Sequence, residues 1–100
     1  MIAHIVCWKV KEEFNGAKKE SLIQEFKEKL EALPALIDII VDFQVGVNFT
    51  NTPAGCHLSL YSTFKTKEDL ETYAVHPDHK KVVEFAGQIV IDRVVSDYEF

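Results

Sequence analysis

Four segments of the chain alternate hydrophobic and polar residues with a period of two, which predicts β-strands. We expect strands at residues 2–10, 38–47, 57–64 and 89–98. The first segment carries apolar residues on both of its alternating sides, with His4 among them. In the second, Asp42 and Gln44 share one side, which indicates an edge strand with one wet face.

A helical period runs through residues 17–33, where apolar side chains form one stripe and Glu and Lys cover the opposite side. The stripe consists of Leu22, Phe26, Leu30 and Leu33. Pro34 ends this predicted helix, because the residue before a proline is disfavoured in helical conformation.

A second helical region is interrupted. Thr66 is placed to cap a helix that runs to about residue 75, since a Thr side chain accepts a hydrogen bond from the free N–H groups of the first turn. Pro77 breaks this helix and begins another piece, which we expect to run to Ala86 and to close at Gly87.

The predicted elements follow the order β-α-β-β-α-β, which is that of the ferredoxin-like α+β fold with one antiparallel sheet. Right-handed crossovers place both helical regions on the same face of this sheet. The first and last strands are apolar on both sides, so a monomer would expose an apolar patch on the order of several hundred Å². We therefore expect a homodimer in which a second copy covers the bare face.

The composition is that of a globular protein. The chain has 100 residues, of which 47% are hydrophobic and 27% charged, and we expect one domain spanning residues 1–100. The formal net charge is −5, with 11 basic residues interspersed among 16 acidic ones. Nucleic-acid binding relies on clustered Lys and Arg, so nucleic acid is not an expected partner.

Other features bear on location. No apolar run approaches the roughly 18 residues of a membrane span, and the apolar start lacks the basic segment and cleavage site of a secretory signal. Cys7 and Cys56 form neither a disulfide framework nor a metal-binding spacing. We expect a cytoplasmic protein with reduced thiols, no membrane partner and no cofactor or metal.

The candidate chemistry is concentrated in residues 73–79, which contain Tyr73, His76, Asp78 and His79 at the break between helices. Histidine exchanges protons near neutral pH, and a Tyr hydroxyl beside it can act as an acid, a base or an oxyanion donor. The structural alternative is that His76 and Asp78 cap the restarted helix while His79 bonds a backbone carbonyl. A metal site at His76 and His79 has no evident third ligand.

His4 has two interpretations. A single His among apolar neighbours is commonly a core residue with satisfied hydrogen bonds, but on a sheet face without helices it could line a cavity that has Trp8 as a wall. Cys56 and His57 are not a nucleophile–base pair, because adjacent residues of a strand point to opposite faces.

Several segments together resemble the Dabb family, the stress-responsive dimeric α/β-barrel domain. They are residues 4–11, Pro34, Gly46, Phe64 with Leu70 and Tyr73, residues 76–79, and Asp97 with Tyr98. The match covers nearly the whole chain, and the ordered set is more specific than any single segment. The resemblance implies that two ferredoxin-like sheets face one another in a dimer and enclose a barrel.

The resemblance also implies site residues. One family member is a polyketide cyclase that uses a Tyr–His pair in the barrel cavity; Tyr73 and His79 match this pair, and His4 matches a cavity His. These three are the expected catalytic residues. Leu58 departs from the cyclase, which has a further His at that position. The expected substrate-binding residues are Val6, Trp8, Leu58 and His76.

Two functions stay open. In the first, the barrel binds a small, partly apolar molecule and performs cofactor-free acid/base chemistry, with His79 as general base and Tyr73 steadying an enolate. In the second, the chain is a non-catalytic stress-response protein whose cavity is closed or filled by side chains such as Trp8. A pocket that reaches both Tyr73 and His79 favours the first.

Overall fold

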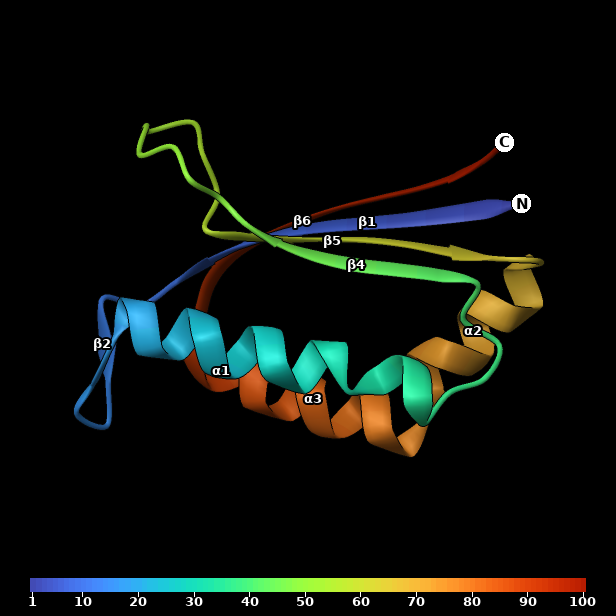
Figure 1. Cartoon of the computed structure of the whole chain (residues 1–100), viewed down its shortest axis with the longest axis horizontal. Helices are drawn as coiled ribbons and strands as arrows, with labels where there is room; N and C mark the ends of the chain where they lie inside the picture. Colours follow the sequence, from blue (N-terminus) through green and yellow to red (C-terminus); the bar gives the residue numbers. More distant parts are fainter.

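A four-stranded antiparallel sheet forms one layer of the molecule and the helices form the other (Figure 1). The computed structural model describes all 100 residues. The strands lie in the order β4-β5-β1-β6, and their bounds are β1 Ile2–Val10, β4 Asp42–Val47, β5 Leu58–Phe64 and β6 Val90–Glu99. The fold is the expected ferredoxin-like α+β arrangement, and β4 is an edge strand as its polar side indicated.

All helices cover the same face of the sheet (Figure 1). Their bounds are α1 Lys19–Glu31, the short 3₁₀ helix η1 Leu33–Ala35, α2 Lys67–Val75 and α3 Pro77–Ile89. Thr66 caps α2 as expected, since its Oγ1 accepts a hydrogen bond from the Asp69 N–H at 3.1 Å. The α-helical conformation of α1 ends before Pro34, and the chain continues through that proline as η1.

The first helix begins later than the hydrophobic pattern predicted. A small hairpin of β2 (Glu13–Phe14) and β3 (Ala17–Lys18) occupies the residues in front of it. Its turn is Asn15-Gly16, with φ of 50° and 82°, and these two residue types adopt the left-handed conformation of a two-residue hairpin at least cost. The strand pairing at residues 17–18 therefore delays the helix.

The second long strand is shorter than predicted, because it begins at Asp42 and not at residue 38. The register pairs Asp42 with Thr63, and the Val41 N–H still donates to the Thr63 carbonyl at 2.9 Å. Its partner β5 ends one residue later at Phe64, so residues 38–40 lie beyond the end of that strand. Thr63 marks the start of the pairing: its Oγ1 accepts from the Asp42 N–H at 3.1 Å and donates to the Asp42 carboxylate at 2.7 Å.

The expected closure of α3 at Gly87 is wrong, because the helix continues to Ile89. Glycine inside a helix costs about 1 kcal/mol relative to alanine. Ile89 is fully buried at the end of the helix, and burying such a side chain contributes roughly 2 kcal/mol. The second effect is larger, so the helix passes through the glycine.

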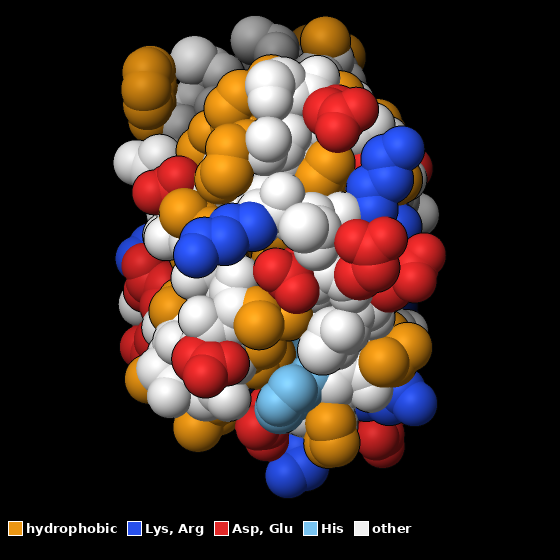
Figure 2. Space-filling view, turned by 90° about the vertical axis from the view of Figure 1, so that its right-hand side faces the viewer, with side chains coloured by type: hydrophobic (Ala, Val, Ile, Leu, Met, Phe, Trp, Pro, Cys, Tyr) orange, Lys and Arg blue, Asp and Glu red, His pale blue; other side chains and the backbone are white.

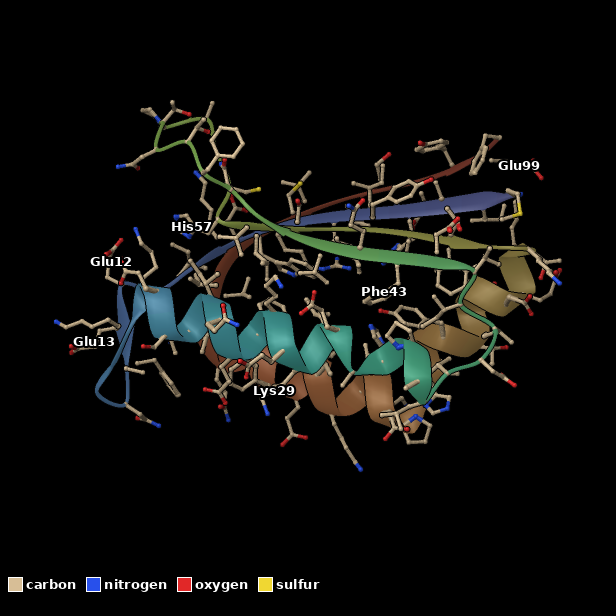
Figure 3. The ribbon with its side chains drawn as sticks, in the orientation of Figure 1. Glu12, Glu13, Lys29, Phe43, His57 and Glu99 are labelled. Atoms are coloured by element: carbon tan, nitrogen blue, oxygen red, sulfur yellow. The ribbon has the colours of Figure 1, made fainter.

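The core lies between the two layers. In β1 and β5, alternate residues point toward the helices and are buried. Figure 3 shows Phe43 pointing from β4 into this space while Lys29 points away from the sheet. The Trp8 ring packs against Phe26 of α1 with centroids 4.8 Å apart. The core cluster includes Ile2, Val6, Trp8, Val10, Leu22, Phe26, Leu30, Leu58, Leu60, Phe64, Tyr73 and Ile89.

No helix of the chain covers the opposite face of the sheet, which we call the open face. Its residues include Ala3, Ile5, Cys7, Tyr61, Val94 and Tyr98, because residues paired directly across strands point to the same side. Val94 is 63% exposed there. The loop between β4 and β5 rises on this side (Figure 1), and it carries Phe49, which is 98% exposed.

Candidate functional site

A cavity of about 240 Å³ lies between the sheet and its own helices, and ten of its 14 lining residues are hydrophobic. Its walls come from β1, β5, β6, α1 and α3, with Tyr73 of α2. His4, Val6 and Trp8 all line it. His4 does line a cavity, but its side of β1 packs on the helices, so the interpretation that placed this cavity on the sheet face without helices is wrong.

Tyr73 carries a buried hydroxyl with no hydrogen-bond partner beside this cavity. The side chain is 1% exposed and lies against Phe64 and His79, with ring centroids 5.1 and 4.3 Å from its own. Burial raises the pKa of Tyr73 well above its usual range, so the phenol keeps its proton at neutral pH. The hydroxyl thus keeps a hydrogen-bond donor that no group of the chain accepts.

His79 comes from the first turn of α3 and lines the cavity. Its Nδ1 lies 3.0 Å from the Ala74 carbonyl oxygen. A carbonyl only accepts, so Nδ1 carries the proton and Nε2 is left as the acceptor. Burial lowers the pKa of His79, which keeps the imidazole neutral near pH 7. The backbone contact that the structural alternative required is present, and it sets the tautomer of a cavity residue.

His4 is held by a carboxylate that sequence analysis did not assign. Its Nδ1 lies 2.5 Å from Asp97 Oδ1, and it donates to this oxygen. Asp97 stands directly opposite His4 in the β1–β6 pairing, which puts both side chains on the same sheet face. A carboxylate at Nδ1 orients the ring and leaves Nε2 as the acceptor. The register of the first and last strands is the signal that could have identified this pair.

Arg93 is a second cavity residue that sequence analysis missed. It lies on β6 directly opposite Trp8 and therefore on the helix-facing side of the sheet. The alternation in β6 alone does not distinguish this side from the other, because most of its residues remain exposed.

Two of the expected substrate-binding residues do not line the cavity. Leu58 is fully buried opposite Trp8, within the core. His76 is the cap of α3, since its Nδ1 accepts from the Asp78 N–H at 3.1 Å. The structure thus brings together His4, Val6, Trp8, Tyr73 and His79, and it leaves Leu58 and His76 outside the group.

Other kinds of site have little support on this chain. Figure 2 shows acidic and basic side chains interspersed at the end of the molecule that carries α2 and both termini. No group of three or more His, Cys, Asp or Glu side chains is placed to hold a metal ion. None of the helices is both long and apolar enough to cross a membrane.

Comparison with known proteins gives a family match over nearly the whole chain. The model of the Stress responsive A/B Barrel Domain (Dabb) matches residues 2–100. One stress-response A/B barrel domain-containing protein of Arabidopsis thaliana is 32% identical in an alignment of 98 residues, which covers 96% of this chain and 35% of that protein. A second protein of this description from the same plant is 26% identical in an alignment of 102 residues, which covers 98% of this chain and 46% of that protein. The chain spans less than half the length of these curated relatives.

Solved structures share the fold. A dimeric protein of unknown function from Bacteroides fragilis has a TM-score of 0.85 and 34% identity, covering 99% of this chain and 95% of that one. A hydroxynitrile lyase from Passiflora edulis has a TM-score of 0.80 with 18% identity, covering 97% of this chain and 90% of that one. At that identity the second likeness concerns the fold alone.

Proposed function

The chain belongs to the stress-responsive A/B barrel domain (Dabb) family, and on this premise we propose that it forms a homodimer that binds a small, partly apolar molecule in the cavity between its sheet and helices. Cofactor-free acid/base chemistry on that molecule is the second part of the proposal. The acting residues are His79 and Tyr73, with His4 placing the substrate.

The observation that carries this proposal is the Tyr73 hydroxyl, which is buried and unpartnered beside the cavity. Buried polar groups in proteins nearly always have a hydrogen-bond partner, and leaving one without costs about 1–3 kcal/mol. A ligand oxygen that accepts from this hydroxyl removes the cost. The cavity also reaches both Tyr73 and His79, which favours the binding hypothesis over a filled barrel.

The arrangement supports proton abstraction next to a carbonyl. The lone pair of His79 Nε2 takes a proton from the carbon beside the substrate carbonyl, and the electrons of that C–H bond move to the carbonyl oxygen. Tyr73 donates its hydrogen bond to the resulting enolate oxygen. The proton on His79 exchanges with solvent before it returns to the carbon. The low pKa of His79 and the high pKa of Tyr73 keep each group in the protonation state that this step needs.

The open face supports the homodimer. It exposes Tyr61, Val94 and Tyr98 on one sheet surface, and a contiguous apolar surface of this kind commonly marks an interface. The Bacteroides fragilis structure, which is similar over nearly the whole chain, is described as dimeric.

The proposal also includes the extent and the location of the protein. We propose that residues 1–100 form one domain, that this domain carries the activity, and that the protein acts in the cytoplasm.

Hydrogen–deuterium exchange of an aryl alkyl ketone tests the catalytic part. We expect the protein to speed the replacement of the α-hydrogens of valerophenone by deuterium in D₂O, followed by NMR. General base catalysis contributes about 10²–10⁴-fold, and His79→Asn should lose an acceleration of this order. The Asn amide keeps the donor to the Ala74 carbonyl while removing Nε2. Tyr73→Phe should lose a similar factor, because the enolate has no donor.

His57→Asn is the matched control. His57 Nδ1 accepts from the Val10 N–H at 2.9 Å outside the cavity, and the Asn carbonyl oxygen can accept in its place. Its exchange rate should equal that of the unmodified protein. Ketone binding without any protein-dependent exchange would refute catalysis and support the non-catalytic stress-response alternative. Absence of ketone binding, seen by saturation transfer, would refute the cavity as a binding site.

A further inference from the structure

We propose that the ligand of the cavity is an amphipathic carboxylate, whose apolar part fills the cavity and whose carboxylate binds Arg93 at the cavity edge. This inference rests on the proposed function, because it names the substrate class of the same site.

Arg93 is the only Lys or Arg among the 14 residues that line the cavity. Every salt bridge of the chain is made by other residues, so the guanidinium has no acidic partner. Arginine is always charged, and it is the residue best suited to recognising a carboxylate. A guanidinium without an acidic partner on a mostly apolar cavity therefore points to an anionic group on the ligand.

The acidic residues of β6, which are Asp92, Asp97 and Glu99, do not line the cavity and so do not favour a cationic ligand. Asp97 lies four residues from Arg93 on the same side of β6, but its carboxylate accepts from His4 Nδ1. His79 is uncharged near neutral pH, since burial lowers its pKa. No Asp or Glu lines the cavity, so Arg93 is the permanently charged residue in its wall, on a chain whose net charge is −5.

The size and lining of the cavity describe the rest of the ligand. Its volume of about 240 Å³ exceeds the roughly 150 Å³ of a protein cavity that holds benzene. Ten of the 14 lining residues are hydrophobic. An aromatic ring with a short alkyl chain fits this volume. A carboxylate is the anion of choice, because the planar guanidinium offers two parallel N–H donors that match its two oxygens.

The test compares two probes of nearly the same shape, the anionic 4-propylbenzoate and the neutral 4-propylbenzamide. We expect isothermal titration calorimetry at pH 7.5 to show that the unmodified protein binds the benzoate about tenfold more tightly, as for a partly exposed charge-assisted hydrogen bond. In Arg93→Gln this preference should disappear, whereas Arg93→Lys should keep part of it. Lys81→Gln is the charge-matched control, since Lys81 pairs with Asp78 outside the cavity, and its preference should stay about tenfold.

The outcomes separate the two proposals. Equal binding of both probes by the unmodified protein overturns the carboxylate inference and leaves cavity binding intact. A benzoate preference that survives in Arg93→Gln also overturns it, because the charge then acts elsewhere. If neither probe binds the unmodified protein, cavity binding itself fails and the inference fails with it. Loss of the preference in Arg93→Gln alone supports the assignment.

Discussion

The two faces of the sheet are built from the same strands and yet have opposite environments. On the helix-facing side Val6, Trp8 and Leu60 are buried by elements of the same chain. On the open face Tyr61 and Val94 are 38% and 63% exposed. Alternation in a strand assigns residues to two sides, but it does not decide which side is covered. The helix-facing side has its cover within the chain, whereas the open face has none within the chain (Figure 1).

The polar groups of the two faces also differ. On the helix-facing side His4 and Tyr73 are buried next to a cavity, where Asp97 sets the tautomer of His4 and burial raises the pKa of Tyr73. On the open face the polar side chains of β4, Asp42 and Gln44, lie at an edge strand. Chemistry is thus expected on the covered side, and association on the other.

The largest effect is expected from the helix-facing side. Phe26 is 1% exposed and packs on Trp8, so Phe26→Ala should lower the free energy of unfolding by about 3–5 kcal/mol in urea titrations. Phe49→Ala, at a fully exposed loop position, is the comparison and should change it by less than about 0.5 kcal/mol. If Phe26→Ala does not fold, Phe26→Leu should cost about 1 kcal/mol. Similar values for Phe26→Ala and Phe49→Ala would contradict the difference between the two sites.

The next effect tests association through the open face. Val94→Asp buries an unpaired carboxylate in the proposed interface, and it should weaken dimerisation by about 100-fold or more in sedimentation experiments. Val75→Asp is the matched control, because Val75 is 62% exposed on α2 in the helix layer. It should leave the dimer unchanged. If the unmodified chain sediments as an 11.4 kDa monomer at micromolar concentration, the open face does not form a dimer interface.

A smaller effect of opposite sign is expected at the cavity. Tyr73→Phe removes a buried hydroxyl that has no partner, so the unliganded protein should gain roughly 1 kcal/mol in the free energy of unfolding. The same variant should lose ketone exchange, which separates a functional role of the hydroxyl from a structural one. A loss of stability in Tyr73→Phe would mean that the hydroxyl is satisfied in solution.

The smallest effect concerns pH. Burial lowers the pKa of His79 below the ordinary 6.5, so the unfolded chain binds this proton more tightly than the folded one. Above about pH 6.5 His79 is neutral in both states and does not lower the free energy of unfolding. As the pH drops from there through the folded-state pKa of His79, the free energy of unfolding falls. Urea titrations at pH 7.5, 6.5 and 5.5 should show this decrease in the free energy of unfolding. In His79→Asn the decrease should be smaller, by less than about 1 kcal/mol. Part of the decrease should remain, because the pKa of His57 is also lowered. An identical pH dependence in His79→Asn would show that His79 does not contribute.

Much of the fold was predictable because its signals are local. The capping Thr66 and the proline before α3 act on neighbouring residues, and both helices begin where these residues predict. Errors arose where a distant partner decides. The start of β4 depends on where β5 ends, and the passage of α3 through Gly87 depends on the burial of Ile89.

The candidate site was predictable in part for the same reason. His4, Tyr73 and His79 came from a segment pattern and a family resemblance, and all three line the cavity. Asp97 and Arg93 were missed because they join the site only through the register of β1 against β6. His76 illustrates the reverse case, in which a residue close to the site in sequence does not belong to it. It directly precedes α3 and caps that helix, and it does not line the cavity.

The sequence by itself determined the order of the elements, the split of the second helical region and the apolar character of both sides of β1. These follow from hydrogen bonding and periodicity within a few residues. Only the tertiary structure decided which side of β1 meets the helices, and hence that the cavity lies within one chain. That choice depends on the packing of α1 and α3 on the sheet, where shape and buried area are summed over residues far apart in the chain.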